Sequence, residues 1–258
     1  MSELYIMRWP NDLSAIYVNG ATIRYFKNRY VYYANEVMSP GQVICSWYSE
    51  SDYLDSGIAP SLPLLQVTKS YELDFKLKAD NSLPVQIQLK FYDEQHQTIQ
   101  SLSDTANHLK FVVPEHTASY EINLINLKHH WIMFDYLAIR ERLNSEPIVI
   151  EKKFMQHYDW IYAGKTAKIE PKIVKLIISS GLKRVTPITI NSDQNIAQIF
   201  VFTDGDEVDQ LITDLRYAFQ EKHHYQMIMS PGVGYYMIAD EITKKIADEL
   251  NLRKEIGG

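Results

Sequence analysis

The segment from residue 71 to residue 78 alternates strictly between apolar and charged side chains. It reads Tyr71-Glu72-Leu73-Asp74-Phe75-Lys76-Leu77-Lys78. A period of two places alternate side chains on opposite faces of a β-strand, with one face toward a core and the other toward water. Residues 85–91 and 120–125 repeat this pattern, and residues 131–139 form a further apolar run. Short strands at spacings of roughly ten residues, with no amphipathic helix between them, predict a jelly-roll-like β-sandwich.

Turn residues separate these runs. Asp80-Asn81-Ser82 is predicted to be a turn, and Lys27-Asn28-Arg29 is predicted to be the tip of a hairpin between two strands. Basic residues interleaved with aromatic ones at 24–33 are also typical of platforms for single-stranded nucleic acid. The net charge of the chain is −6, which disfavours binding to a phosphate backbone. We therefore favour the hairpin and expect no nucleic-acid partner.

The periodicity changes near residue 145, so we divide the chain into a sandwich domain at 1–145 and a small α/β extension at 146–258. Extended segments at 196–203 and 225–229 alternate with two predicted helices, a strand–helix order that implies a small parallel sheet. The first helix is predicted to start with Asp204 as its cap, and the second to start near Tyr235. Residues 166–180 suggest another helix, with Pro171 in its first turn.

Composition restricts the cellular compartment in which such a chain is expected. Cys45 is the only cysteine, so an internal disulfide and a multi-cysteine zinc site are excluded. Residues 1–11 lack the apolar stretch of a signal peptide, and no run reaches the roughly 18 apolar residues that span a bilayer. We expect a cytoplasmic protein whose membrane contact, if any, is made through partners.

Several longer stretches occur in an order that resembles a known family. They are Ile6 to Pro10, Tyr33 to Ile44 with its Met38-Ser39-Pro40-Gly41 core, Trp47, Tyr53, Pro60-Ser61-Leu62-Pro63-Leu64-Leu65, Phe91-Tyr92-Asp93 and Tyr120 to Asn126. This series resembles the third of the accessory secretory proteins of the accessory Sec system of Gram-positive bacteria. The resemblance covers residues 1 to about 142 and does not extend to the α/β segment.

The resemblance implies a non-enzymatic subunit without a cofactor, folded like a carbohydrate-binding module. Its implied partners are two sister accessory secretory proteins, the dedicated SecA-type motor and a glycosylated Ser-rich adhesin. The implied role is to assist in modifying and exporting that adhesin. None of this comes from periodicity or composition.

A sugar site needs flat aromatic rings for the apolar faces of pyranoses, and carboxylate or amide groups for their hydroxyls. The strongest candidate is the polar, strand-breaking segment around Trp47, because loops commonly carry binding groups. Core packing is the better explanation for Trp9 and Trp131, and it explains Trp47 and Tyr48 as well as sugar contact does. The candidate glycan-binding residues are Trp47, Tyr48, Asp52, Tyr53, Trp9, Asn35 and Glu36.

Histidine pairs and one acidic segment are weaker candidates for metal binding. His129-His130, His223-His224 and His157 lack a third metal ligand at suitable spacing, and Asp204-Gly205-Asp206 lacks the terminal Glu of a calcium loop, so we expect no metal site.

Ser230 lies in a segment that partly resembles a hydrolase nucleophile elbow. Pro231 removes an oxyanion-hole N–H, and no histidine follows the serine. The turn at Ser230, Gly232 and Gly234 could instead bind an anion at a helix N-terminus.

Three functions therefore remain open at this point. The preferred one is a non-catalytic glycan-binding and scaffold subunit of an export complex. The alternatives are a hydrolase or transferase that uses Ser230, and a purely structural interaction subunit whose aromatic residues are buried at subunit contacts.

Overall fold

The computed structural model describes residues 2–50, 59–80, 85–142, 148–165, 173–182, 185–190, 196–220 and 226–254. The chain forms two compact units. The sandwich unit contains Glu3–Leu143 and Arg184–Ile188, and the α/β unit contains Met1–Ser2, Asn144–Lys183 and Thr189–Gly258. Within the described residues, no helix has the length and apolar character needed to cross a membrane.

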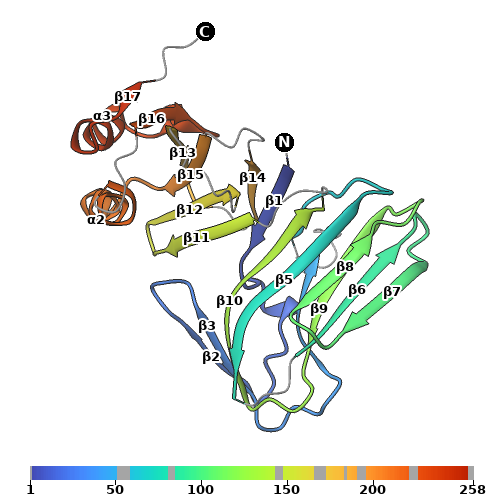
Figure 1. Cartoon of the computed structure of the whole chain (residues 1–258). Helices are drawn as coiled ribbons and strands as arrows, with labels where there is room; N and C mark the ends of the chain where they lie inside the picture. Colours follow the sequence, from blue (N-terminus) through green and yellow to red (C-terminus); the bar gives the residue numbers. More distant parts are fainter. Residues whose placement is uncertain are drawn as a thin grey trace. The chain divides into compact units, whose positions relative to one another are not determined.

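Two sheets build the sandwich unit (Figure 1). The seven-stranded sheet contains β1 (Ser2–Met7), β2 (Thr22–Tyr25), β3 (Val31–Ala34), β5 (Ser70–Ala79), β8 (His108–Val112), β10 (Trp131–Glu141) and β14 (Val185–Ile190). The four-stranded sheet has the order β4 (Val43–Tyr48), β9 (Ser119–Ile125), β6 (Gln86–Tyr92) and β7 (Thr98–Asp104). One 3₁₀ turn, Leu13–Ala15, follows β1. These observations confirm the predicted β-sandwich and its strands at 71–78, 85–91, 120–125 and 131–139.

The sandwich core forms where the apolar positions of both sheets meet. Tyr71, Leu73 and Phe75 of β5 are buried, whereas Lys76 and Lys78 between the apolar positions are exposed. The pairing of β2 with β3 places Tyr25 opposite Val31, which confirms the predicted hairpin around 27–29. Asn81 and Ser82 of the predicted turn at 80–82 lie outside the described part of the chain.

Four aromatic rings join the two sheets at the centre of the core. Trp47 of β4 lies with its ring centroid 5.6 Å from Phe75 of β5 and 5.7 Å from Phe134 of β10. Trp9 packs edge-on against Trp47 at 6.4 Å. The indole N–H of Trp47 donates to the carbonyl oxygen of Arg8 at 2.7 Å, so its one polar atom is satisfied inside the core.

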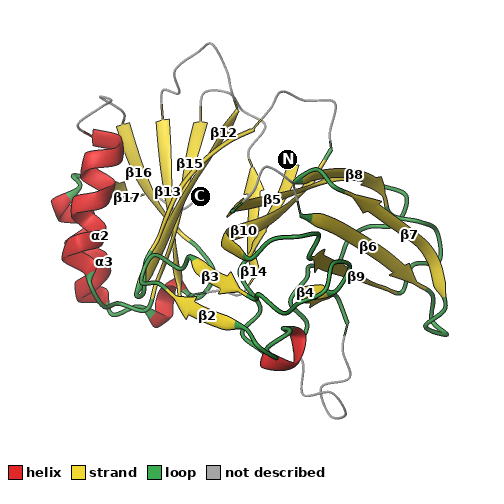
Figure 2. Ribbon diagram, turned by 90° about the horizontal axis from the view of Figure 1, so that it is seen from below, coloured by secondary structure: helices red, strands yellow, loops and turns green. Residues whose placement is uncertain are grey.

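The α/β unit contains a six-stranded sheet with the order β11 (Ile148–Phe154), β12 (Tyr158–Lys165), β15 (Ile196–Thr203), β13 (Ile173–Ser180), β16 (Gln226–Pro231) and β17 (Arg253–Lys254). β13 pairs in parallel with β15 and β16, so the predicted small parallel sheet is present. Helices α2 (Val208–Leu215) and α3 (Asp240–Glu249) lie together on one face of this sheet, as Figure 2 shows. A π-helical segment (Arg216–Gln220) and a 3₁₀ turn (Tyr235–Met237) complete the unit.

The structure corrects three local predictions in this half. The helix expected over 166–180 is wrong, because Ile173–Ser180 is the strand β13, whose Val174, Leu176 and Ile178 are buried under the helices. The second helix starts at Asp240, five residues after Tyr235. Asp204 is not the cap of α2, since Glu207 holds that position, and Asp204 accepts the N–H of Asp206 at 3.0 Å.

One strand that follows residue 145 in the sequence belongs to the sandwich sheet. A boundary at residue 145 assigns β14 to the extension, whereas β14 pairs with β1 at the edge of the seven-stranded sheet. The chain beyond residue 145 therefore contributes a strand to the sandwich.

Candidate functional site

The outward face of the four-stranded sheet carries three rows of polar side chains. Its inward positions are apolar and fully buried, as Ile87, Leu89 and Ile122 show. Residues directly opposite one another on paired strands share a face, so the register places the polar residues in rows across β4, β9 and β6. We call this surface the polar face, defined as Ser46, Tyr48, Gln88, Lys90, Tyr92, Glu121 and Asn123.

Hydrogen bonds connect six residues of the polar face into one network, namely Ser46, Gln88, Lys90, Tyr92, Glu121 and Asn123. Ser46 Oγ donates to Asn123 Oδ1 at 2.5 Å, and Asn123 Nδ2 donates to Gln88 Oε1 at 3.2 Å. The same amide donates to Glu121 Oε1 at 2.9 Å. Lys90 Nζ lies 2.9 Å from Glu121 Oε1. Three donors thus hold the Glu121 carboxylate, because the Tyr92 hydroxyl also donates to it.

The network sets the protonation of its two acidic groups. Burial raises the pKa of Glu121, but hydrogen bonds from Lys90, Asn123 and Tyr92 outweigh it, so the pKa of the carboxyl is lower than usual. Burial, and then the hydrogen bond to Glu121, raises the pKa of Tyr92. At neutral pH the face therefore presents an ionised carboxylate beside a protonated phenol.

A hollow of about 410 Å³ opens beside this network. Its lining residues are Tyr48, Glu50, Tyr92, His96, Ser119, Tyr120 and Glu121. Hydrogen bonds hold both the backbone N–H and the backbone carbonyl of Tyr48. Its N–H donates to Ser61 Oγ at 3.2 Å, and its carbonyl accepts the N–H of Ser61 at 2.8 Å and that of Leu62 at 3.0 Å.

His96 reaches the hollow from the turn between β6 and β7. Asp93 Oδ1 closes this turn by accepting the N–H groups of Gln95 and Gln97 at 2.9 and 2.8 Å. The arrangement supplies aromatic rings, carboxylates, a hydroxyl and an imidazole around one hollow. This set of groups suits the mixed apolar and hydroxyl surface of a sugar.

Of the residues predicted to bind glycan, only Tyr48 lies in this site among those that the structure describes. Trp47 and Trp9 are core residues with relative exposures of 0% and 4%, so their rings cannot stack on a ligand, and their assignment to the site is corrected. Asn35 is buried and stabilises a turn by donating to the carbonyl oxygen of Asn19 and accepting the N–H of Val37. Glu36 is exposed and does not line the hollow. Asp52 and Tyr53 lie outside the described residues.

The residues that the sequence-based prediction missed are Lys90, Tyr92, Glu121 and Asn123. Their signal is present in the alternation of 85–91 and 120–125, where polar residues occupy every second position. That alternation predicted strands correctly. The same alternation places the polar positions together on the opposite face of the sheet.

The segment around Ser230 does not form the predicted anion site. Gly232 and Gly234 precede a 3₁₀ turn of three residues, and α3 begins later with Asp240 and Glu241 in its first turn. The N–H of Gly232 donates to the carbonyl oxygen of Ile178 at 2.8 Å, so it is not available to a ligand. Ser230 is buried in β16 with a relative exposure of 7%. Both the helix N-terminus and the exposed nucleophile are missing at this position.

The tertiary structure brings together three residues that the sequence analysis considered separately. His157 Nδ1 lies 3.0 Å from Asp204 Oδ2 and 3.6 Å from Asp206 Oδ2. A hydrogen bond between the imidazole of His157 and the carboxylate of Asp204 accounts for this grouping. We therefore describe it as a polar cluster of the α/β unit.

Comparisons with known proteins agree on one family. The family model described as "Accessory Sec secretory system ASP3" matches residues 16–141. The accessory Sec system protein of the same name from Streptococcus gordonii is 30% identical over 129 residues, which cover 50% of this chain and 81% of that protein.

Two solved structures share the fold. The crystal structure of accessory secretory proteins 1, 2 and 3 in Streptococcus pneumoniae matches with a TM-score of 0.51 and 21% identity, covering 53% of this chain and 95% of that one. The Glycosylation Associate Protein (Gap123) complex from Streptococcus agalactiae matches with a TM-score of 0.54 and 18% identity, covering 94% of this chain and 75% of that one.

Proposed function

Because the chain belongs to the ASP3 family of the accessory Sec secretory system, we propose that it is a non-catalytic subunit that binds glycan on its polar face. The ligand is a glycan of a Ser-rich adhesin that the system exports. The partners are the sister accessory secretory proteins and the SecA-type motor, and the complex works in the cytoplasm or at the membrane. The two matching solved structures are of accessory secretory proteins 1, 2 and 3 and of the Gap123 complex, which supports the sister proteins as partners.

The observation that carries the proposal is the orientation of Glu121. Lys90, Asn123 and Tyr92 hold its carboxylate before any ligand arrives, so binding does not have to order it. Tyr48 and Tyr92 lie on the same face and line the same hollow. A ring that stacks on a sugar contributes on the order of 1 kcal/mol, by analogy with aromatic pairs. Two rings give weak affinity per sugar, which a densely glycosylated chain raises by multivalency.

The test compares a serine-rich peptide carrying O-linked sugars with the same peptide without sugars, by calorimetric titration. We expect the glycosylated peptide to bind roughly tenfold more tightly or better, a difference of about 1.4 kcal/mol. Tyr48→Ala and Glu121→Gln should each remove most of that difference. Tyr217→Ala is the matched control, since Tyr217 is a 64% exposed tyrosine of the α/β unit. Equal binding of both peptides, with no effect of Tyr48→Ala, would refute glycan binding.

A second candidate function is docking onto a sister subunit through an exposed apolar tip of the α/β unit. Val233, Tyr236 and Met237 have relative exposures of 71%, 90% and 84% within five residues of chain. Exposed apolar groups gathered in this way are typical of protein interfaces. The test is a pull-down from native cytoplasm with the intact protein and with Tyr236→Ala/Met237→Ala. Recovery of the sister proteins by both would contradict a role for the tip, and recovery by neither would contradict the complex.

A further inference from the structure

The outward face of the seven-stranded sheet carries a second surface, separate from the polar face. The register places Arg24 opposite Tyr32, Tyr32 opposite Met133, and Met133 opposite Lys78. Directly opposite residues share a face, so these four form one row across β2, β3, β10 and β5. Three strand spacings make the row about 14 Å long.

Aromatic rings form the flat part of this surface. The ring of Trp131 stacks on Tyr32 with centroids 6.0 Å apart and an interplanar angle of 25°. The guanidinium of Arg24 lies 5.9 Å from the centroid of Tyr32. Trp131 and Tyr32 are half-buried, unlike the fully buried Trp47. A half-buried stack of this kind offers an apolar plane with a cation at its edge.

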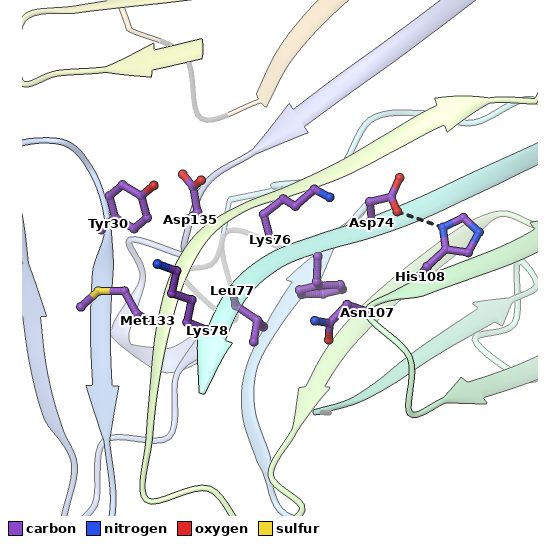
Figure 3. A pocket seen from close by; sticks show the side chains of 10 residues that line it. Tyr30, Asp74, Lys76, Leu77, Lys78, Asn107, His108, Met133 and Asp135 are labelled. Atoms are coloured by element: carbon purple, nitrogen blue, oxygen red, sulfur yellow. Dashed lines mark hydrogen bonds and ion pairs between the residues drawn. The ribbon is translucent and has the colours of Figure 1, made fainter. Parts of the chain in front are cut away.

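A hollow of about 390 Å³ adjoins the row at Lys78 and Met133. Figure 3 shows Lys76 and Lys78 extending from β5 on the same side as Tyr30, Met133 and Asp135. Asp135 is the extra residue of a β-bulge in β10, because the pairing with β5 shifts between Phe134 and Tyr136. A bulge redirects a side chain, and here it adds a carboxylate to the outward face.

On this surface three cationic side chains, Arg24, Lys76 and Lys78, stand with two carboxylates, Asp74 and Asp135. Asp74 Oδ1 is 2.9 Å from His108 Nδ1, and Asp135 accepts a hydrogen bond from the Tyr30 hydroxyl. Within the part of the chain that the structure describes, Lys76 and Lys78 form no ion pair. Uncompensated ammonium groups beside a flat aromatic plane attract a ligand that carries negative charge on a ring-shaped body.

We propose that this face, formed by Arg24, Tyr32, Trp131, Lys76, Lys78 and Asp135, is a binding site for an acidic saccharide. The aromatic stack contacts the apolar face of a sugar ring, and the lysines contact its carboxylate groups. Asp135 and the Tyr30 hydroxyl are placed to bind sugar hydroxyls. A polynucleotide fits less well, because it carries a charge on every nucleotide and so meets Asp74 and Asp135 as well as the cations. A saccharide that is charged only on alternate sugars can place its carboxylates at the cations and its hydroxyls at these two aspartates.

The probe is a hexasaccharide of alternating glucuronic acid and N-acetylglucosamine, titrated into the full chain at about 50 mM salt, where charge contacts are weakly screened. The neutral comparison is a hexamer of N-acetylglucosamine. We expect the acidic probe to bind at this face, and Lys76→Glu/Lys78→Glu to weaken it roughly tenfold or more. Lys244→Glu/Lys245→Glu is the matched control, with the same change in net charge at two exposed lysines of α3. The control should change binding by about twofold at most.

The aromatic contact is tested separately. Trp131→Ala should weaken binding of the acidic probe, and Trp131→Phe should restore most of it because a ring remains. Circular dichroism and thermal unfolding verify that each variant is folded. Glu121→Gln, which alters the polar face on the other sheet, should leave binding of the acidic hexasaccharide unchanged. This variant separates a failure of the present proposal from a failure of the proposed function.

Three results would overturn the proposal. The first is no binding of the acidic hexasaccharide at low salt. The second is equal weakening by both lysine double variants, which would indicate attraction by overall charge. The third is tighter binding of an oligothymidine of about twelve nucleotides that depends on the same residues, which would assign the face to single-stranded nucleic acid.

Discussion

Glu121 on β9 and Lys90 on β6 lie directly opposite each other, with Lys90 Nζ 2.9 Å from Glu121 Oε1. The side chains are 17% and 32% exposed, so this pair is neither buried in the core nor free in solvent. Its position explains how a sheet surface can hold a carboxylate in one orientation. The pair is the central element of the proposed glycan site.

Lys90→Met should weaken ligand binding more than it weakens the fold. The substitution keeps the length of the side chain and removes the ammonium that orients Glu121. Since partly exposed ion pairs contribute little to stability, the free energy of unfolding should fall by less than about 1 kcal/mol. Binding of the glycosylated peptide should fall by roughly tenfold. Urea unfolding and calorimetric titration measure the two effects, and a large loss of stability with intact binding would contradict this assignment.

Trp47→Ala and Tyr48→Ala should have opposite consequences although the residues are neighbours. Trp47 packs against Trp9, Phe75 and Phe134, and its removal leaves a cavity between the sheets, so unfolding should become easier by about 3–5 kcal/mol. Tyr48 lines the outer hollow, and Tyr48→Ala should lower stability by only about 1 kcal/mol or less while removing glycan binding. Denaturant unfolding of both variants tests this contrast. A mild effect of Trp47→Ala would show that the ring is not a core element.

Acidification should weaken the polar face through Glu121. The pKa of its carboxyl lies below the ordinary value of 4.5 in the folded chain. A lowered folded pKa contributes stability that is fully present above the ordinary value and is lost as the pH falls through the folded value. Stability measured by urea unfolding should therefore fall below about pH 4.5, and glycan binding should fall with it.

Glu121→Gln supplies the control for this pH dependence, because an amide does not titrate in this range. Its stability should change less with acid than that of the unaltered chain. Identical acid profiles for the two proteins would assign the effect to other carboxyl groups. Asp80 is one of these, because hydrogen bonds from His130 lower the pKa of its carboxyl by more than burial raises it.

Gly234→Ala should destabilise the α/β unit more than Gly181→Ala. Both glycines have positive φ, at +71° and +70°, which costs an alanine about 1–2 kcal/mol. A Cβ on Gly234 would also lie 2.1 Å from Ser180 Oγ, whereas a Cβ on Gly181 meets no atom within 4 Å. Thermal unfolding of the two variants separates backbone strain from steric overlap. Equal losses would mean that Ser180 moves aside at little cost.

Local patterns predicted strands well wherever one face is buried and the other is wet. The alternation at 71–78 and 120–125 corresponds to β5 and β9, and the hairpin at 27–29 lies between β2 and β3. The same approach failed at Ile173–Ser180. Burial alternates there, but Ile173 and Ile177 on the less buried face are apolar too, so the sequence shows no period of two. The predicted second helix also begins too early, at Tyr235, because the 3₁₀ turn Tyr235–Met237 lies only two residues before α3.

The amino-acid sequence alone determined that this chain builds a β-sandwich, continues as an α/β segment and belongs with the accessory Sec proteins, because period and motif order are properties of neighbouring residues. Tertiary structure decided which rings are available to a ligand. Trp47 and Tyr48 are adjacent in sequence, yet strand geometry sends one into the core and the other outward. Tertiary structure also decided that Lys90 contacts Glu121 and that one row contains Arg24, Tyr32, Met133 and Lys78. Those contacts join residues distant in the chain, and strand pairing, which sets them, depends on long-range packing.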